Sequence, residues 1–396
     1  MRLKRKETKN ITYGGVKGVT EPPKNKKKKW IIIIVIILFL GGCVFGASKA
    51  IDKFAPNSKI LKSLVKTLPL VEDKLDGEEN GRINVVLLGM RGKGVTGGGT
   101  LADTIMVVSI KRIENPEGIA SYKISMVSVP RDLYVTMSGT TSNMKINSVY
   151  HYGEEKGNGQ GMEAMKQVLE DITGQKMHYG AEVNFAGFKQ VVDALGGVEV
   201  DLAEKFIEPV QFHEQKVCDG DNNGVFTVKS GEYQNKIDHR GKLVAQYPLC
   251  YNATEECGGI FTVPAGISIL DGEKALCYVR ARATSSDFDR ARRQQEVMGQ
   301  LKKKALSMGV LTDFGKIQEL FTAVSGNMNT DLELWEMQRF FDLYKKIGDD
   351  VPVEHKVLEN SEEGLLYSHE GDERGYILMP RGDTYDKIRE MFANII

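Results

Sequence analysis

INVVLLGM, at residues 83–90, is the stretch that decides the fold. It is a short, nearly continuous apolar run with a glycine near its end, as expected of a strand buried on both faces of a sheet. DTIMVVSIK (103–111) and YKISMVSVP (122–130) have the same character, whereas EAMKQVLEDIT (163–173) has the periodicity of an amphipathic helix. Strands that alternate with helices in this way predict a layered α/β domain with a mixed sheet.

The alternation continues towards the C-terminus. Residues 179–202 predict a strand, a helix and a second strand, and further helices are expected at 288–306, 312–325 and 331–347. Residues 267–282 are predicted to form a turn, a short helical turn and a strand. The tail holds the strand-like patches VPVEHKVLE and GYILMP before a final helix.

Residues about 208–262 break this rhythm. They are polar and rich in Gly and Asn, which favours an elaborated loop or a small β-insertion in the domain. They also hold Cys218, Cys250 and Cys257. In an oxidising compartment two of these thiols can pair and leave the third free, and the alternative is that all three stay unpaired and partly buried.

Upstream of the domain, WIIIIVIILFLGGCVFGA (30–47) contains no charged residue. A helix needs about 20 apolar residues to cross the hydrocarbon core, so this run spans if its flanking residues reach the interface. Lys26 to Lys29 directly precede it, which by the positive-inside rule places the N-terminus in the cytoplasm. We therefore predict a basic cytoplasmic tail (1–29), a transmembrane helix (30–48), an extracytoplasmic stalk (49–80) and a domain (81–396).

The net charge of the chain is zero, but its two parts differ strongly. Residues 1–30 hold eleven basic and two acidic residues, a net charge of +9, so the remainder carries 42 basic and 51 acidic residues, or −9. Such a tail indicates contact with an anionic bilayer and not with nucleic acid. A cleavable signal peptide and a lipoprotein with a lipidated Cys43 are the alternatives, and both leave the domain outside the cell.

The strongest chemical signal is YVRARATSSDFDRARRQQ (278–295). Arg280 and Arg282 lie two apart in the predicted strand and therefore point to one face. Arg290 and Gln294 lie four apart on the following helix, again on one face. Converging guanidinium groups match phosphate oxygens, so we expect a pyrophosphate site, with a surface ion-pair network as the alternative.

Three further clusters accompany it. Arg131 and Asp132 follow a strand, at the edge where open α/β sheets bind ligands. Lys145 and Asn147 follow a polar loop, and Asp103 opens a strand after the loop GKGVTGGGT. That loop does not match a Walker motif, and the chain contains no G-x-S-x-G or H-E-x-x-H motif.

In their order, INVVLLG, ADTIMVVSI, MVSVPRDLYV, MKINSVY, VNFAGFKQVVDALGGVEVDL, LDGEKALCYVRAR and DFDRARRQQEV resemble the LytR–CpsA–Psr family of bacterial cell-envelope proteins. The resemblance covers about 83–306. It implies an α/β/α domain with an apolar groove for a polyprenyl chain. It also implies transfer of a glycopolymer from undecaprenyl pyrophosphate to peptidoglycan, assisted by Mg²⁺ or Mn²⁺, with no nucleic-acid partner.

The resemblance also implies roles for individual residues. Asp103 matches a metal-associated aspartate, and we expect Asp289 to join it as a metal ligand. The catalytic candidates are Arg131, Asp132, Arg280, Arg282, Arg290 and Gln294. The substrate-binding candidates are Lys145, Asn147, Arg91 and Arg293.

Two departures from the family pattern bear on the metal. Gly89-Met90-Arg91 stands where an acidic residue is usual, and Leu101-Ala102 stands where Arg-Ser is usual. Metal binding by Asp103 alone is therefore in question, and Arg91 is an alternative source of positive charge. The missing carboxylate leaves open a lipid-binding module without transferase activity. A transcriptional regulator is disfavoured because no helix-turn-helix signal precedes the predicted anchor.

Overall fold

The computed structural model describes residues 74–395, apart from gaps at 94–98, 115, 117–119, 158, 210–211, 214, 219–225, 239, 253–255, 349–350 and 370–374. These residues all belong to one compact unit, Pro69–Ile396. Within them, no helix combines the length and apolar character needed to span a bilayer. The predicted tail, the predicted membrane helix (30–48) and residues 49–73 of the predicted stalk lie outside the described residues.

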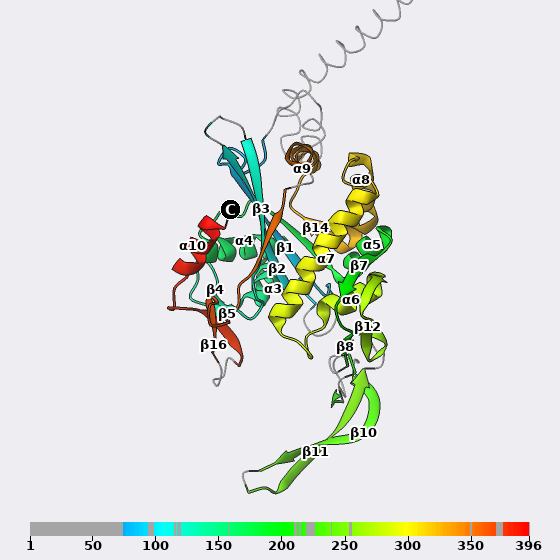
Figure 1. The fold of residues 1–396 in the computed structure, drawn as a ribbon. Coiled ribbons are helices and arrows are strands. Elements are labelled where there is room, and N and C mark those ends of the chain that lie inside the picture. Colours follow the sequence, from blue (N-terminus) through cyan, green and yellow to red (C-terminus); the bar gives the residue numbers. More distant parts are fainter. Residues whose placement is uncertain are drawn as a thin grey trace, which may run out of the picture. The chain divides into compact units, whose positions relative to one another are not determined.

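A six-stranded sheet forms the centre of the unit, in the order β14-β6-β1-β2-β3-β15 (Figure 1). Its strands are β14 (Met328–Thr330), β6 (Tyr179–Asn184), β1 (Arg82–Met90), β2 (Thr104–Glu114), β3 (Ala120–Ser128) and β15 (Val353–Val357). β1 pairs antiparallel with β2 and parallel with β6, and β3 pairs antiparallel with β2 and parallel with β15. The predicted mixed sheet is confirmed.

The two faces of β1 have different surroundings. Val86, Leu88 and Met90 belong to a core shared with three helices, α3 (Val149–Lys156), α4 (Gln160–Thr173) and α10 (Asp386–Asn394). Leu87 and Gly89 point the other way and line a cavity. The strand is therefore packed on one face and borders a hollow on the other, which an apolar sequence run alone does not reveal.

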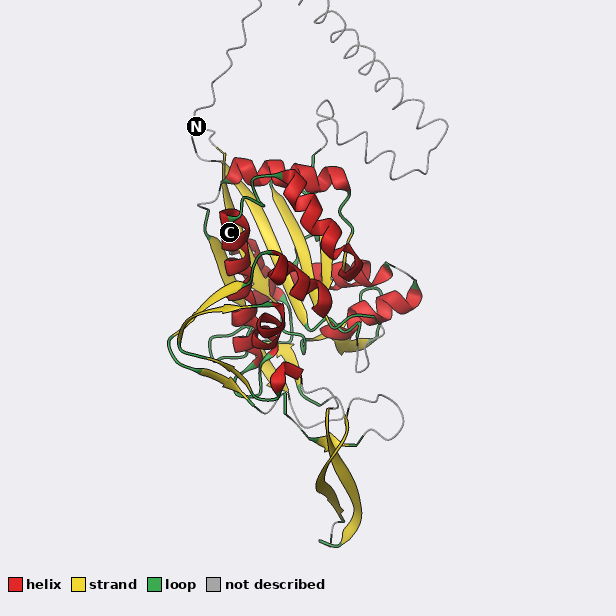
Figure 2. Cartoon of the chain, turned by 90° about the vertical axis from the view of Figure 1, so that its right-hand side faces the viewer, coloured by secondary structure: helices red, strands yellow, loops and turns green. Residues whose placement is uncertain are grey.

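Further helices cover the cavity side of the sheet (Figure 2). They are α5 (Phe185–Ala194), α6 (Gly272–Arg280) and α7 (Asp287–Ser307), followed by α8 (Phe314–Val324) and α9 (Leu334–Ile347). Val192, Val297 and Leu301 contribute to a second core, which also includes two small strand pairs: β7 (Val198–Leu202) with β13 (Gly266–Leu270), and β8 (Phe206–Glu208) with β12 (Phe261–Val263). The remaining pairs are β4 (Tyr134–Thr136) with β5 (Asn143–Lys145), and β16 (Leu366–His369) with β17 (Ile377–Pro380).

The strand predicted around residues 278–282 is wrong. The segment folds as α6, because the Asp271 side chain accepts a hydrogen bond from the backbone N–H of Lys274 and starts a helix there. Apolar residues 275–279 of this helix are buried in the second core. Arg280 is the last residue of α6 and Arg282 follows its end, so the two do not share a strand face.

The segment 208–262 forms the predicted β-insertion. Its main part is a long antiparallel hairpin, β10 (Phe226–Ile237) and β11 (Leu243–Asn252), with the short strand β9 (Lys216–Val217) paired to β11. Figure 1 shows this hairpin leaving the body of the unit. We call residues 226–252 the arm.

Two disulfides lie at or near the base of the arm. Cys218 pairs with Cys250, and Cys257 pairs with Cys277 of α6. The expectation that two of three cysteines pair therefore holds for the first bond. The third cysteine, Cys257, is not free, because it is bonded to Cys277. This partner was not predicted, since Cys277 lies in an apolar run outside the insertion.

Candidate functional site

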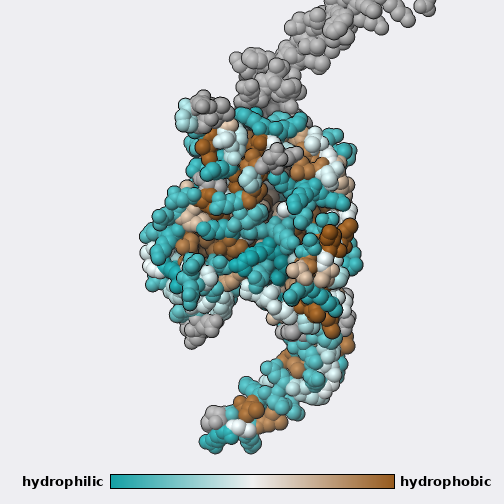
Figure 3. All heavy atoms as spheres, viewed as in Figure 1, coloured by the Kyte–Doolittle hydropathy of each residue, from teal (hydrophilic) through white to brown (hydrophobic). Residues whose placement is uncertain are grey.

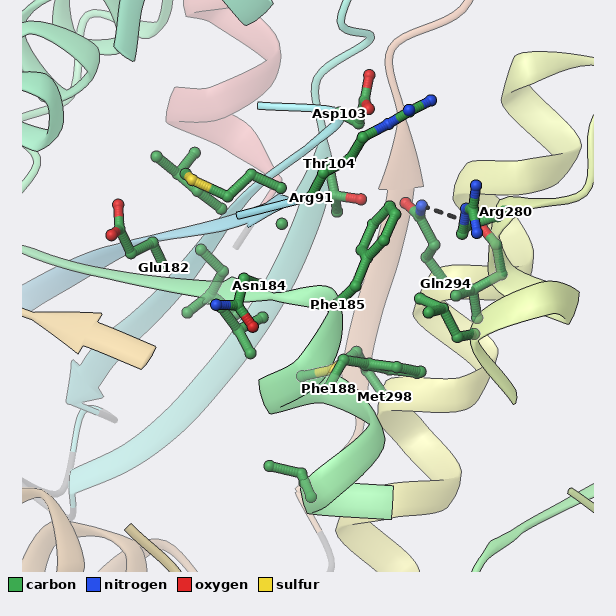
Figure 4. A pocket seen from close by; sticks show the side chains of 18 of the residues that line it. Arg91, Asp103, Thr104, Glu182, Asn184, Phe185, Phe188, Arg280, Gln294 and Met298 are labelled. Atoms are coloured by element: carbon green, nitrogen blue, oxygen red, sulfur yellow. Dashed lines mark hydrogen bonds between the residues drawn. The ribbon is translucent and has the colours of Figure 1, made fainter. Parts of the chain in front are cut away.

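A cavity of about 640 Å³ lies between the central sheet and helices α5, α6 and α7. Most of its wall is apolar. The sheet contributes Leu87, Met106 and Val183, and the helices contribute, among others, Phe188, Val191, Leu276, Met298 and Leu301. Figure 4 labels Phe188 and Met298 among the side chains of this apolar part. An apolar space of this kind suits a hydrocarbon chain.

One end of the cavity is strongly basic. Its lining includes the five arginines Arg91, Arg131, Arg280, Arg282 and Arg290, together with Asp103 and Gln294. Figure 4 shows Arg91, Asp103, Arg280 and Gln294 gathered at this end. The site therefore joins an apolar compartment to a group of planar hydrogen-bond donors that suits phosphate oxygens.

Two carboxylates hold the arginines in place. Arg131 Nη1 lies 2.6 Å from Asp103 Oδ1 and Arg131 Nε lies 3.7 Å from Asp287 Oδ2. Asp287 Oδ1 in turn lies 3.2 Å from Arg290 Nη1 and 3.6 Å from Arg282 Nη1. Asp287 thus links three arginines that come from separate segments. Asp132 also approaches Arg131 and pairs with Lys145, so this network holds four cations and three carboxylates.

The pKa shifts reflect this imbalance. Burial acts to lower the pKa of Arg131, but the carboxylates of Asp103, Asp287 and Asp132 outweigh it and the pKa is raised. Burial lowers the pKa of Arg290, and the charges of Arg131 and Arg282 act in the same direction against Asp287. The positive charge of Arg290 is therefore incompletely compensated, and a bound anion would stabilise it.

Arg280 and Gln294 are positioned by their neighbours. The Arg280 guanidinium carbon lies 4.6 Å from the centre of the Phe185 ring and 5.7 Å from that of Phe212. Aromatic faces orient a guanidinium by cation–π attraction. Gln294 donates a hydrogen bond to the carbonyl oxygen of Val279, at 3.3 Å. The helical spacing of Arg290 and Gln294 places both side chains in the cavity wall, as predicted.

The other predicted site residues lie outside the cavity lining. Lys145 Nζ is 2.8 Å from Asp132 Oδ1, and Asp132 also approaches Arg131, so this carboxylate is already paired. Asn147 is buried beside them, where its carbonyl oxygen accepts from Ala102 and its N–H donates to the Arg131 carbonyl. These three residues support the loop that carries Arg131.

Asp289 and Arg293 have local structural contacts. Asp289 forms a capping box with Ser286 at the start of α7, and its second oxygen contacts Arg292 at 2.9 Å. Arg293 is buried, donates to the carbonyl oxygens of Tyr278 and Ala281, and lies over the Phe206 ring. Neither side chain is among the residues that line the cavity.

The carboxylates near the cavity form a sparse donor set for a divalent ion. Among the described residues no group of three or more His, Cys, Asp or Glu side chains has metal-binding geometry. Mg²⁺ is commonly held by one or two carboxylates plus phosphate oxygens and water, and Asp103 is the aspartate that lines the basic end. The residues therefore fit a metal that arrives with a phosphate ligand.

Sequence reasoning underrated two acidic residues. Asp287 was not among the predicted site residues, because its contacts with Arg131 and Arg282 depend on segments far apart in the chain. Glu182, on β6, also lines the cavity, but its neighbours in the sequence form no pattern that marks it as a site residue. Burial raises the pKa of Glu182, with a hydrogen bond from Tyr150 acting against the shift.

Two named bacterial proteins are similar to this chain in sequence. A polyisoprenyl-teichoic acid–peptidoglycan teichoic acid transferase, TagU of Bacillus mycoides, is 27% identical over 335 residues, which is 82% of each chain. The cell wall biosynthesis protein LcpA of Corynebacterium glutamicum is 30% identical over 259 residues, covering 60% of this chain and 39% of that protein.

Solved structures share the fold. A Streptococcus agalactiae protein matches with a TM-score of 0.54 and 19% identity, covering 81% of this chain and 92% of that one. A protein described as a transcriptional regulator from Enterococcus faecalis matches with a TM-score of 0.50 and 23% identity, covering 81% and 89%. The LytR_cpsA_psr family model matches residues 47–369. The chain belongs to the LytR_cpsA_psr family.

Proposed function

We propose that this protein is a membrane-anchored, extracytoplasmic phosphotransferase. It moves a glycopolymer from an undecaprenyl-pyrophosphate carrier to peptidoglycan. The observation that carries this proposal is the five-arginine group at one end of an apolar cavity. A ligand with an anionic head and a long hydrocarbon tail matches both parts of this cavity. One relative is named for teichoic acid transfer to peptidoglycan and another for cell wall biosynthesis, and both names support the same chemistry.

The arginines bind the pyrophosphate and the apolar wall holds the polyprenyl chain. The acceptor hydroxyl oxygen attacks the phosphorus that bears the glycopolymer, and a new P–O bond forms. The bond from that phosphorus to the bridging oxygen breaks, so polyprenyl phosphate leaves with the electron pair. Arg290, Arg282 and Arg280 stabilise the negative charge that develops on the leaving phosphate.

The acceptor proton goes to a carboxylate at the basic end. Asp132, one of the catalytic candidates, is paired with Lys145 and lies outside the cavity lining. Asp103 lines the cavity and keeps one oxygen, Oδ2, besides the Oδ1 that contacts Arg131. We therefore assign proton removal to Asp103.

Mg²⁺ or Mn²⁺ would be held mainly by the pyrophosphate oxygens beside Asp103, whose Oδ2 then stays available for the proton. When bound, such an ion neutralises phosphate charge and orients the group that is transferred. Asp289 would not hold it, because both of its oxygens already contact Ser286 and Arg292. Removal of metal with EDTA should lower the rate, and added Mg²⁺ should restore it.

The decisive experiment uses the full-length protein in detergent with a polyprenyl-pyrophosphate glycan donor and peptidoglycan. We expect Arg280→Ala to lower both donor binding and product formation. A matched control is Arg292→Ala, because Arg292 lies on α7 but pairs with Asp289 and Glu359 away from the cavity. Equal activity of wild type and Arg280→Ala would refute the site assignment.

The second candidate function is lipid-pyrophosphate binding without transfer. It is favoured by the pairing of Asp103 with Arg131, which engages the carboxylate that would take the proton. In the same experiment this candidate predicts tight donor binding that depends on Arg280, without glycopolymer transfer at any metal concentration.

A further inference from the structure

The arm is continuous with the basic end of the cavity. Lys216 of β9, Phe226 at the start of β10 and Asn252 at the end of β11 all line the cavity wall. Lys216 Nζ lies 5.1 Å from the centre of the Phe226 ring, so β9 and β10 meet there. A ligand whose pyrophosphate contacts the arginines therefore has a path from the cavity onto the arm.

The arm is held firmly at this base. The Cys218–Cys250 disulfide joins the residue after β9 to β11. Gln215 donates a hydrogen bond to the Tyr251 hydroxyl at 2.9 Å, and the His213 and Tyr251 rings lie 4.8 Å apart. The base of the arm is thus fixed relative to the cavity opening, which suits a surface that guides a ligand.

Beyond its base the arm exposes apolar and aromatic side chains. Tyr233 is 59% exposed, Ile237 and Val244 are each 60% exposed, and Tyr247 is 41% exposed. Figure 3 shows hydrophobic residues scattered among hydrophilic ones along the arm. They alternate with amides such as Asn235 and Gln246, which hydrogen-bond each other at 2.9 Å across the strands. Tyrosine rings beside amides stack on sugar rings and hydrogen-bond their hydroxyls.

The charge of the arm is opposite to that of the surrounding domain. Its described residues include the four cations Lys229, Lys236, Arg240 and Lys242 and the two anions Glu232 and Asp238. The chain after residue 30 carries a net charge of −9. Basic residues gathered on one projection of an acidic domain attract a polyanion to that projection.

We propose that the arm is a binding surface for the glycopolymer part of the lipid-linked donor. The inference rests on the proposed function and extends it to a second contact surface outside the cavity. The polymer leaves the cavity at Lys216, runs along the arm, and contacts Tyr233 and Tyr247 through its sugars and Lys236 through its phosphates or carboxylates. Length and charge of the polymer, and not the lipid, would then decide which donors are used.

The test shortens the arm without touching the site. Residues 234–247 are replaced by Asn-Gly in the full-length protein, which keeps the Tyr233–Pro248 pair, the Cys218–Cys250 bond and the residues that line the cavity. Asn-Gly favours the two-residue turn that closes a hairpin. A second variant, Tyr233→Ala with Tyr247→Ala, leaves the arm in place and removes only two exposed rings.

Binding is measured with a soluble, glucosylated glycerol-phosphate polymer that carries no lipid, with neutral dextran as the control. We expect both variants to bind the polymer at least about tenfold more weakly than wild type, and wild-type binding to weaken as salt rises. Equal polymer binding by all three proteins would overturn the proposal. Equal binding of dextran and polymer by wild type would overturn recognition of the polymer by the basic residues of the arm. Arm-dependent binding of peptidoglycan alone would overturn the assignment of the arm to the donor.

A parallel measurement separates this inference from the proposed function. Polyprenyl pyrophosphate without a glycan should bind wild type and both arm variants equally, because the cavity residues are unchanged. If no protein transfers glycan but the polymer still binds through the arm, the transferase proposal fails and the arm proposal stands. If transfer occurs and the arm variants retain full preference for long anionic donors, the arm proposal fails alone.

Discussion

Arg290→Gln is the most informative single change. The Arg290 side chain is buried, and its Nη1 lies 3.2 Å from Asp287 Oδ1. A hydrogen bond to a charged group contributes about 1.5–3 kcal/mol, so loss of one phosphate contact should weaken binding of a polyprenyl pyrophosphate by about 10- to 150-fold. Glutamine keeps a polar, shorter side chain and removes the charge.

The same change should lower the free energy of unfolding by less than the loss of a buried ion pair usually does. Breaking such a pair costs about 3–5 kcal/mol when it leaves an unpaired buried charge. Here Asp287 keeps Arg282 at 3.6 Å and Arg131 at 3.7 Å, so we expect the free energy of unfolding to fall by less than about 3 kcal/mol. Loss of binding should therefore occur in a protein that is still folded.

The assay is a titration of detergent-solubilised protein with a short-chain polyprenyl pyrophosphate, beside urea unfolding of the same preparations. Arg292→Gln is the control, because Arg292 is on the same helix and equally cationic but contacts Asp289 and Glu359 outside the cavity. Wild-type affinity in folded Arg290→Gln would refute the reasoning. Equal weakening in both variants would show that the effect is one of general charge and not of this site.

Three further predictions concern the cavity wall, pH and the disulfides. Phe188→Asp places a carboxylate in the apolar wall and should abolish binding of long polyprenyl chains while inorganic pyrophosphate still binds, as calorimetry would show. The pKa of Glu182 is raised in the folded protein, so its contribution to stability is present below the unfolded pKa of 4.5 and is lost as pH rises through the folded pKa. Glu182→Gln should therefore flatten that part of a plot of melting temperature against pH. An unchanged slope would contradict this. Replacing Cys257 and Cys277 by Ser opens a loop between residues 20 apart and should lower the free energy of unfolding by about 3 kcal/mol, measured in urea without reductant; no change would mean that the bond is absent in the wild type.

Much of the fold could be predicted because its signals are local. The apolar runs at 83–90, 103–111 and 122–130 became β1, β2 and β3, and the helical periodicity of 163–173 and 288–306 became α4 and α7. The spacing of Arg290 and Gln294 was sufficient to place both on one face of α7. Side-chain direction within one helix or strand depends only on neighbouring residues, so a sequence contains it.

Predictions failed where the outcome depended on distant contacts. Residues 275–282 are apolar enough for a strand, and their helix is decided by the Asp271 cap and by packing against α5 and α7. The predicted site included Asp289 and not Asp287. Residues two apart on a helix point in different directions, so the two aspartates have different surroundings. Only the position of Arg131, about 150 residues earlier in the chain, makes Asp287 the residue that joins the arginines.

The sequence by itself determined the family, the alternation of strands and helices, and the set of arginines available for an anion. Only the tertiary structure decided that β1 borders a cavity on one face, that Cys277 pairs with Cys257, and that the base of the arm lines the cavity. The physical reason is that residue type and spacing act through neighbours along the chain. Cavities, disulfides and ion-pair networks arise instead from which surfaces are left facing each other after the layers have packed.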